Sequence, residues 1–225
     1  MDNDIDLFLS ERNQAKAAAQ RVLFLMALFS TLLGVLYLIG LVGKIIVDGT
    51  VHSVSSPGIQ LVSAIIAILL DLSLLILFIT LRWQISGKHL VFADLAVVFM
   101  VLVCATSTIN WFVQLAVVPR LAQSGNPGLL ALLNVHEDLS LMYAVEHLGW
   151  GLFYGLATIF MAIALGSNKL ENWVRGLLIV GGTLSILHLI GIIIANPIIA
   201  DLGYLAWGVL LPFTTMLLAV RYKSH

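Results

Sequence analysis

The sequence predicts an all-α fold, a polytopic bundle of six transmembrane helices with both termini in the cytoplasm. Of its 225 residues, 60% are apolar and only 10% are charged, whereas soluble domains carry about 45–50% apolar and roughly 25% charged residues. The apolar residues form blocks of about 20 or more, the length that a helix needs to cross ~30 Å of hydrocarbon. Lysine and arginine fall between these blocks, and their uneven distribution predicts the orientation.

Charged or turn-forming residues bound each apolar block. Pro57 opens the second block, Pro119 and Arg120 end the third, and Asn196 with Pro197 ends the fifth, because proline cannot continue the helical hydrogen-bond ladder. The last two blocks should therefore form a tight helical hairpin. The expected spans, which form a single transmembrane domain over residues 22–220, are 22–43, 58–81, 90–118, 141–166, 176–196 and 202–220.

Three segments lie outside the expected spans. Residues 1–21 contain DLFLSERNQAKAAAQR, which predicts a short cytoplasmic helix that runs into the first span, and residues 221–225 form a cytoplasmic tail. The acidic start MDNDID is unlike the basic start of a secretory signal peptide. In the loop 119–140, Pro127 and Gly128 mark a turn, and the apolar spacing after them predicts a short interfacial helix before the fourth span.

Lysine and arginine gather on one side of the expected bundle. Of the 11 such residues, only Lys44 and Arg120 lie on the opposite side. The others are Arg12, Lys16, Arg21, Arg82, Lys88, Lys169, Arg175, Arg221 and Lys223. The positive-inside rule then places this side, with both termini, in the cytoplasm of a cell-membrane protein.

Composition also limits the partners and cofactors. A net charge of −1 leaves no basic face for nucleic acid. The single cysteine, Cys104, excludes an intrachain disulfide and a cysteine-based zinc site, and no metal site is expected. The expected partners are the lipid bilayer and a small-molecule or ion ligand, while oligomerisation and the identity of any cofactor stay open.

The stretch YAVEHLGWGLFYG, residues 143–155, places ionisable side chains inside a membrane span. Such a group costs ~2.5–3.5 kcal/mol at the centre of a helix on insertion scales, so its partners matter. At 100° per residue, Tyr143, Glu146, His147 and Trp150 fall within an arc of about 100°. Gly151 and Gly155 form a GxxxG pair, which we expect on a separate face that packs against a second helix.

Polar residues in three other spans stand at related depths. Asn110 and Gln114 lie one turn apart in the third span, Asp71 lies near the midplane in the second, and His188 lies in the fifth. With a rise of 1.5 Å per residue, Glu146 and Asn110 are both about 10 Å outward of the midplane. The polar residues thin out toward the cytoplasm, which predicts an outward-facing cavity closed at its base.

These residues form a candidate ligand-binding site, and each also has a purely structural interpretation. Asn110 and Gln114 can hydrogen-bond across helices, and His188 can be a satisfied interior histidine. Asp71 is either protonated or paired with His188 or water, which makes it a candidate proton-coupling carboxylate. The outer aromatic belt is an alternative role for Trp111, Trp150 and Trp207. The candidate ligand-binding residues are Asn110, Gln114, Tyr143, Glu146, His147, Trp150 and His188.

Two stretches carry a family resemblance, INWFVQLAVVPR at residues 109–120 and VEHLGWGLFYGLATIFMAIAL at residues 145–165. They resemble motifs of uncharacterised bacterial six-helix integral membrane proteins that share a domain of unknown function. The matching positions are Asn110, Trp111, Phe112, Val113, Gln114, Glu146, Leu148, Gly149 and Trp150, with variation expected at His147. The resemblance implies six spans and a shared polar site, and it implies no activity.

Four functions are compatible with these residues. The first is transport or binding of a small molecule or ion. The second is a membrane-embedded enzyme that acts on a lipid or isoprenoid, with Glu146 and His147 as general acid and base. The third is a haem or quinone protein with His147 and His188 as axial ligands, whose depths differ by ~6 Å. The fourth is a structural or partner-binding subunit in which every polar group joins helices.

Overall fold

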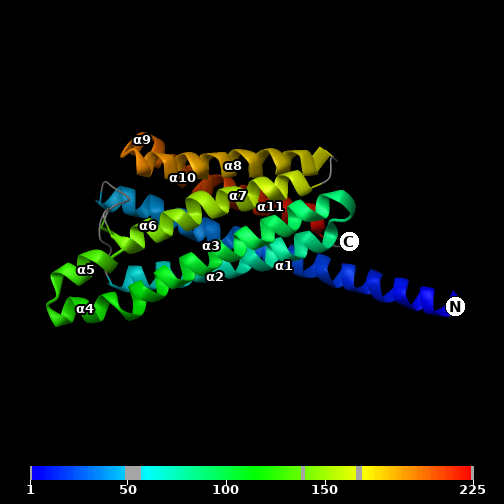
Figure 1. The fold of residues 1–225 in the computed structure, drawn as a ribbon, viewed down its shortest axis with the longest axis horizontal. Coiled ribbons are helices and arrows are strands. Elements are labelled where there is room, and N and C mark those ends of the chain that lie inside the picture. Colours follow the sequence, from blue (N-terminus) through cyan, green and yellow to red (C-terminus); the bar gives the residue numbers. More distant parts are fainter. Residues whose placement is uncertain (1, 49–56, 138–139, 166–168, 224–225) are drawn as a thin grey trace.

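The computed structural model describes residues 2–48, 57–137, 140–165 and 169–223. These residues form helices and short connections, with no strand among them. Six helical stretches are long and apolar enough to cross a membrane (Figure 1), which confirms the predicted all-α bundle. They are Gln14–Gly40, Ile59–Gln84, Gly87–Ser124, Leu141–Ala164, Leu170–Ile193 and Pro197–Tyr222.

The first two spans are long uninterrupted helices. α1 (Asp2–Asp48) continues the first span through the N-terminal segment, so the expected short helix and the first span are one element that extends beyond the bundle (Figure 1). α2 (Pro57–Gln84) packs against it. Proline is tolerated at the start of α2 because the first amide groups of a helix have no intrahelical acceptor.

The third span and the loop after it contain more helix than the sequence suggested. A short 3₁₀ helix, η1 (Gly87–His89), leads into α3 (Leu90–Ala116). α4 (Val118–Ser124) follows almost directly, and α5 (Pro127–Leu133) covers the segment where a short helix was expected. α3 ends just before Pro119, near the predicted end of the third span. Pro119 lies in the first turn of the next helix, α4, where its missing N–H costs no hydrogen bond.

The fourth span changes its helix type near the middle. It consists of α6 (Leu141–His147), a π-helical segment η2 (Leu148–Phe153) and α7 (Tyr154–Ala164). π-Helical turns are rare and are frequent at functional sites. In this span the π-helical segment begins directly after Glu146 and His147.

The fifth and sixth spans form the expected helical hairpin. α8 (Lys169–Ile193) is continuous, and α9 (Pro197–Ala200) and α10 (Leu202–Leu205) turn the chain back along it.

A second π-helical segment, η3 (Ala206–Leu210), precedes α11 (Leu211–Tyr222). Pro212 lies in the first turn of α11 and has no N–H to donate to the preceding turn, which accounts for the irregular backbone of η3.

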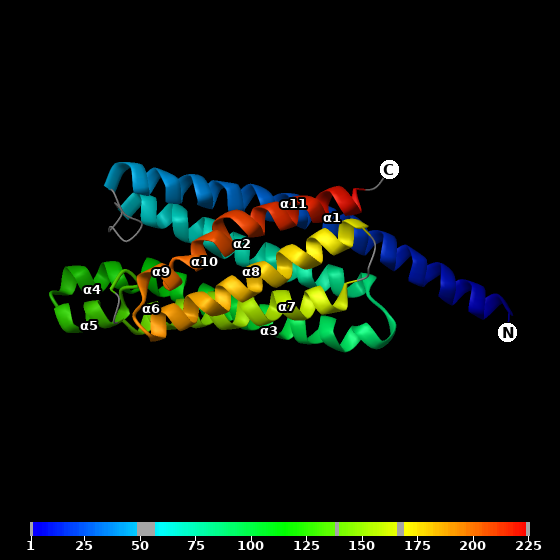
Figure 2. The ribbon, with the colours of Figure 1, turned by 90° about the horizontal axis from the view of Figure 1, so that it is seen from above.

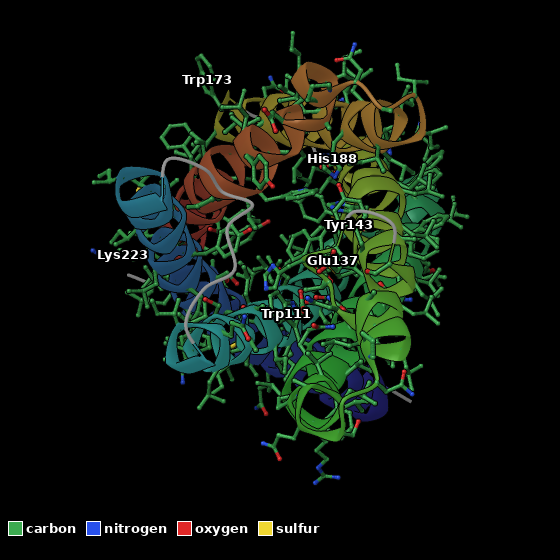
Figure 3. All side chains as sticks on the ribbon, turned by 90° about the vertical axis from the view of Figure 1, so that its left-hand side faces the viewer. Trp111, Glu137, Tyr143, Trp173, His188 and Lys223 are labelled. Carbon is green, nitrogen blue, oxygen red and sulfur yellow. The ribbon has the colours of Figure 1, made fainter. Side chains whose placement is uncertain are left out.

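The six spans form a closed ring. Neighbouring spans pack against each other in chain order, the last span packs against α8, and α11 returns to α1. The view along the bundle in Figure 3 shows this ring. One end of the bundle holds the start of α1 and the ends of α2, α7 and α11, and we call it the terminal end (Figures 1 and 2). The opposite end, which carries α4, α5 and α9, is called the hairpin end.

Large apolar side chains are buried in the half of the ring that is nearer the terminal end. Leu77 of α2 and Met161 of α7 are fully buried and follow Asp71 and Glu146 along helices that run toward the terminal end. Met100 of α3, also fully buried, precedes the polar residues of a helix that runs the other way. Glu146, His147 and His188 lie nearer the hairpin end, whereas Asp71 lies close to the middle of α2.

Candidate functional site

A hydrogen bond joins the third and fourth spans between two residues that the sequence predicts to share one level. Asn110 Nδ2 of α3 donates to Glu146 Oε2 of α6 over 2.7 Å, and Asn110 is fully buried. Hydrogen bonds to a carboxylate are shorter and about twice as strong as those between neutral groups. The two residues therefore lie at one level and hold α3 and α6 in a fixed register.

Gln114 extends this connection to the segment after α5. Its Nε2 donates to Asn110 Oδ1 at 3.3 Å and to the carbonyl of Leu133 at 2.9 Å. Its Oε1 accepts from the backbone N–H of Val135 at 3.2 Å. These bonds favour the structural interpretation of Gln114, because its amide is occupied in fixing the position of the chain that enters α6.

Asp71 is the exception among the buried polar groups. Its side chain is fully buried in α2, and neither carboxylate oxygen has a hydrogen-bond partner among the described residues. The Ser107 hydroxyl of α3 is close enough to interact with this carboxyl without meeting hydrogen-bond geometry, and Glu146 is close enough for the two carboxyls to interact electrostatically. The suggested pairing of Asp71 with His188 is wrong, because both ring nitrogens of His188 are engaged elsewhere.

His188 bonds to a backbone carbonyl and to a second histidine. Its Nδ1 lies within hydrogen-bond distance of the Ala200 carbonyl at the end of α9, and its Nε2 lies 2.7 Å from His147 Nδ1. A carbonyl only accepts, so His188 Nδ1 must carry its hydrogen. A neutral His188 then accepts at Nε2, and His147 donates from Nδ1, an assignment that follows from the hydrogen-bond network.

Two glycines make room for this histidine. A Cβ atom added at Gly203 of α10 would lie 2.7 Å from His188 Nδ1, and one added at Gly191 of α8 would overlap the backbone of Ala200. Real Cβ atoms do not approach so closely. The absence of side chains at Gly191 and Gly203 therefore lets α9 and α10 pack onto α8 and brings the Ala200 carbonyl to the imidazole.

The direct contact between the two histidines also affects the haem hypothesis. Axial ligation by His147 and His188 would require an iron atom and a macrocycle between their nitrogens. The 2.7 Å separation of Nδ1 and Nε2 leaves no space for either. Among the described residues, no three histidine, cysteine, aspartate or glutamate side chains converge on a possible metal position.

The GxxxG pair packs against α8, the helix that His147 also contacts. A Cβ atom at Gly151 would lie 2.8 Å from Leu189 Cβ of α8, and one at Gly155 would lie 2.9 Å from the carbonyl of Gly182. The predicted close approach of a second helix is confirmed. The expected separate face is wrong, because residues 147, 151 and 155 are four apart and lie on one side of the helix.

Trp150 and Trp207 belong to the interior of the ring. They are 7% and 8% exposed, and their indole rings lie 5.6 Å apart. Trp150 Nε1 donates to Ser107 Oγ at 3.4 Å, and Trp207 Nε1 donates to Ser185 Oγ at 3.0 Å. The aromatic-belt interpretation is therefore wrong for these two residues.

Other aromatic rings continue this wall on both sides. His188 packs edge-on against Trp207 at 4.7 Å, Tyr143 packs against His147 at 4.0 Å, and Tyr154 lies 5.2 Å from Trp150. In Figure 3, Tyr143 and His188 lie toward the interior of the ring, whereas Trp173 and Lys223 lie at its outside. Tyr143, His147, Trp150 and His188 are thus brought together as one group.

Sequence reasoning left out or judged peripheral two further aromatic residues. Tyr37 of α1 lies within electrostatic range of Glu146. The indole N–H of Trp111 is buried and has no acceptor among the described residues. Neither side chain stands in an i, i+4 stripe with the acids, which is the signal that reveals Asn110 and Gln114.

No protein-family model, curated protein or solved structure matches this chain. The resemblance to bacterial six-helix membrane proteins therefore stays a prediction, as does the outward-facing cavity.

Proposed function

We propose that this multi-pass membrane protein binds a small cation between Asp71 and Glu146 and exchanges it for protons across the bilayer. The observation that carries the proposal is Asp71, a fully buried carboxyl whose two oxygens have no hydrogen-bond partner among the described residues. A buried carboxylate without a partner is too costly to persist, so it must hold a proton or a cation. A group that alternates between the two couples their movements.

The charge around Asp71 supports a positive ligand. Glu146 adds a second carboxyl at interacting distance. The ion pairs formed by the described residues are Arg82 with Asp94 and Arg221 with Glu171, and both stand near the terminal end. Among the side chains that the structure describes, no arginine or lysine is paired with Asp71 or Glu146, and a cationic ligand would relieve the repulsion between the two acids.

The distribution of positive residues supports an entry from outside the cell. Nine of the 11 lysines and arginines fall on the side of the termini, which the positive-inside rule assigns to the cytoplasm of the cell membrane. Glu146, His147 and His188 lie nearer the hairpin end. A ligand would thus enter between α5 and α9 and reach Asp71 at the bottom of the site.

Two alternatives receive less support. They are a membrane-embedded enzyme and a structural or partner-binding subunit. Glu146 bonds to α3 and His147 bonds to α8, so the two side chains diverge and do not face one substrate as an acid–base pair. A purely structural role in joining helices explains the hydrogen bonds of Asn110 and Gln114 well. It does not explain Asp71, whose two carboxyl oxygens have no hydrogen-bond partner among the described residues.

Proton exchange can be measured in liposomes that contain the full-length protein and a pH-sensitive dye. Sodium, potassium and choline chloride are added outside in separate runs, and exchange for internal protons makes the lumen alkaline. We expect a response to at least one cation, reduced to the level of empty liposomes in Asp71→Asn. Asp94→Asn, which changes an exposed ion-paired aspartate in the same way, should respond as the wild type does. The proposal would be contradicted if no cation changed the dye signal, or if the response were unchanged in Asp71→Asn.

A further inference from the structure

Granting the proposed function, we infer that the cation is a small organic ammonium ion, held by the carboxyls of Asp71 and Glu146 and by the ring face of Trp150. Carboxylates and aromatic faces are the two kinds of group that recognise ammonium ions in proteins. The site brings both together in the interior of the ring, at the depth of the fourth span where the chain is π-helical.

The position of Trp150 is fixed relative to both acids. It lies one turn after Glu146 in the same span, and its indole N–H donates to Ser107 Oγ at 3.4 Å. Ser107 in turn lies beside the Asp71 carboxyl. This hydrogen bond links the indole to the hydroxyl group that lies beside the Asp71 carboxyl.

The aromatic wall continues beyond this residue. Tyr154 and Trp207 lie 5.2 Å and 5.6 Å from Trp150. Trp150 and Trp207 each lie in a π-helical segment, η2 and η3. The two irregular segments of the bundle therefore meet through their tryptophans at the same wall.

The oxygen atoms near Asp71 suit an inorganic ion less well. Hard cations such as Mg²⁺ and Ca²⁺ take about six to eight oxygen ligands. Three of the oxygen atoms in this region already accept hydrogen bonds from side chains. They are Asn110 Oδ1, Glu146 Oε2 and Ser107 Oγ. The two oxygens of Asp71 are the buried side-chain oxygens without a hydrogen-bond partner in the described part of the chain, and a shell built on two carboxyl groups is small for a bare divalent ion.

Binding to the purified full-length protein tests this inference, with choline as the probe. Isothermal titration calorimetry would compare choline with its uncharged carbon isostere, dimethylbutanol, and with sodium and potassium at equal ionic strength. We expect a heat of binding for choline and none for dimethylbutanol, sodium or potassium. Asp71→Asn should abolish the signal, and Trp150→Leu should weaken choline binding about tenfold, while Trp150→Phe keeps a ring and should bind within about threefold of wild type. Trp173→Leu, at an exposed tryptophan of α8, is the matched control and should bind normally.

The possible results separate the two proposals. If sodium or potassium drives proton exchange through Asp71 and choline does not bind, the inference is wrong and the proposed function stands. If dimethylbutanol binds as well as choline, the site recognises shape and not charge, and the inference is equally wrong. If no cation binds or exchanges, both fail. The comparison of choline with its isostere needs only the wild-type protein, so it decides the matter even where Trp150→Leu does not fold.

Discussion

His147 Nδ1 and His188 Nε2 lie 2.7 Å apart, and this contact joins the fourth and fifth spans inside the ring. The Ala200 carbonyl fixes the hydrogen of His188 at Nδ1, so the direction of the bond between the histidines is also fixed. His188 thereby connects three elements, α6, α8 and α9. The short hairpin of the last two spans depends on this side chain as well as on Pro197.

The two histidines should behave as one unit in stability measurements. His147→Ala and His188→Ala should each destabilise the protein, and the double variant should lose less than the sum by about 1 kcal/mol, the typical net contribution of one hydrogen bond. His188→Ala should have the larger effect because it also leaves the Ala200 carbonyl without its donor. Thermal unfolding of the four proteins in one detergent completes the cycle, and strictly additive losses would show that the contact contributes nothing.

Gly203 should tolerate no side chain. Alanine there would place Cβ 2.7 Å from His188 Nδ1, so we expect Gly203→Ala to cost about 1–3 kcal/mol as the ring is displaced. Gly176→Ala in α8, where a Cβ would meet nothing within 4 Å, is the control and should stabilise the helix by up to about 1 kcal/mol. Equal effects of the two substitutions on the unfolding temperature would argue against the tight packing of α10 on His188.

Glu146→Gln should separate folding from function. A glutamine carbonyl can still accept the hydrogen bond from Asn110 Nδ2, so the unfolding temperature should stay close to that of the wild type. Proton exchange should fall strongly because one of the two acids is gone. Glu171→Gln, which removes the charge from a glutamate paired with Arg221 near the terminal end, should exchange protons normally. A Glu146→Gln protein with full exchange would remove this residue from the site.

Cysteine labelling can test the orientation. Cys104 is buried and should stay unreactive, so a cysteine introduced at an exposed serine reports on its own position. Ser124 lies at the end of α4 and Ser86 lies between α2 and α3, and both are exposed. In intact cells a membrane-impermeant maleimide should label Ser124→Cys and spare Ser86→Cys until the cells are opened. The reverse pattern would place the termini outside.

Length and hydropathy made the architecture predictable. Six apolar blocks of sufficient length could only be six helices, because a chain in hydrocarbon must satisfy its backbone groups internally. The level shared by Asn110 and Glu146 was also predictable, since a helix rises by a constant amount per residue. The i, i+4 spacing of Asn110 and Gln114 likewise leads directly to their observed hydrogen bond.

Contacts that depend on helix rotation and irregular backbone could not be predicted in this way. The two π-helical segments have no clear signature except Pro212 after the second. The depths of His147 and His188 differ by ~6 Å in a count of helical rise, yet the two imidazoles meet because both side chains reach across that interval. The Asp71 carboxyl has no hydrogen-bond partner among the described residues because of the directions in which its neighbouring side chains point. No pattern within one helix reveals those directions.

The infrared difference spectrum of the reconstituted protein tests most directly whether Asp71 exchanges a proton for a cation. The spectra with and without choline, and separately with and without sodium, would be compared in wild type, Asp71→Asn and Asp94→Asn. The account predicts that at least one cation removes the carbonyl band of a protonated carboxyl in the wild type and in Asp94→Asn, and leaves no such change in Asp71→Asn. A spectrum that no cation alters, or a band loss that persists in Asp71→Asn, would contradict it.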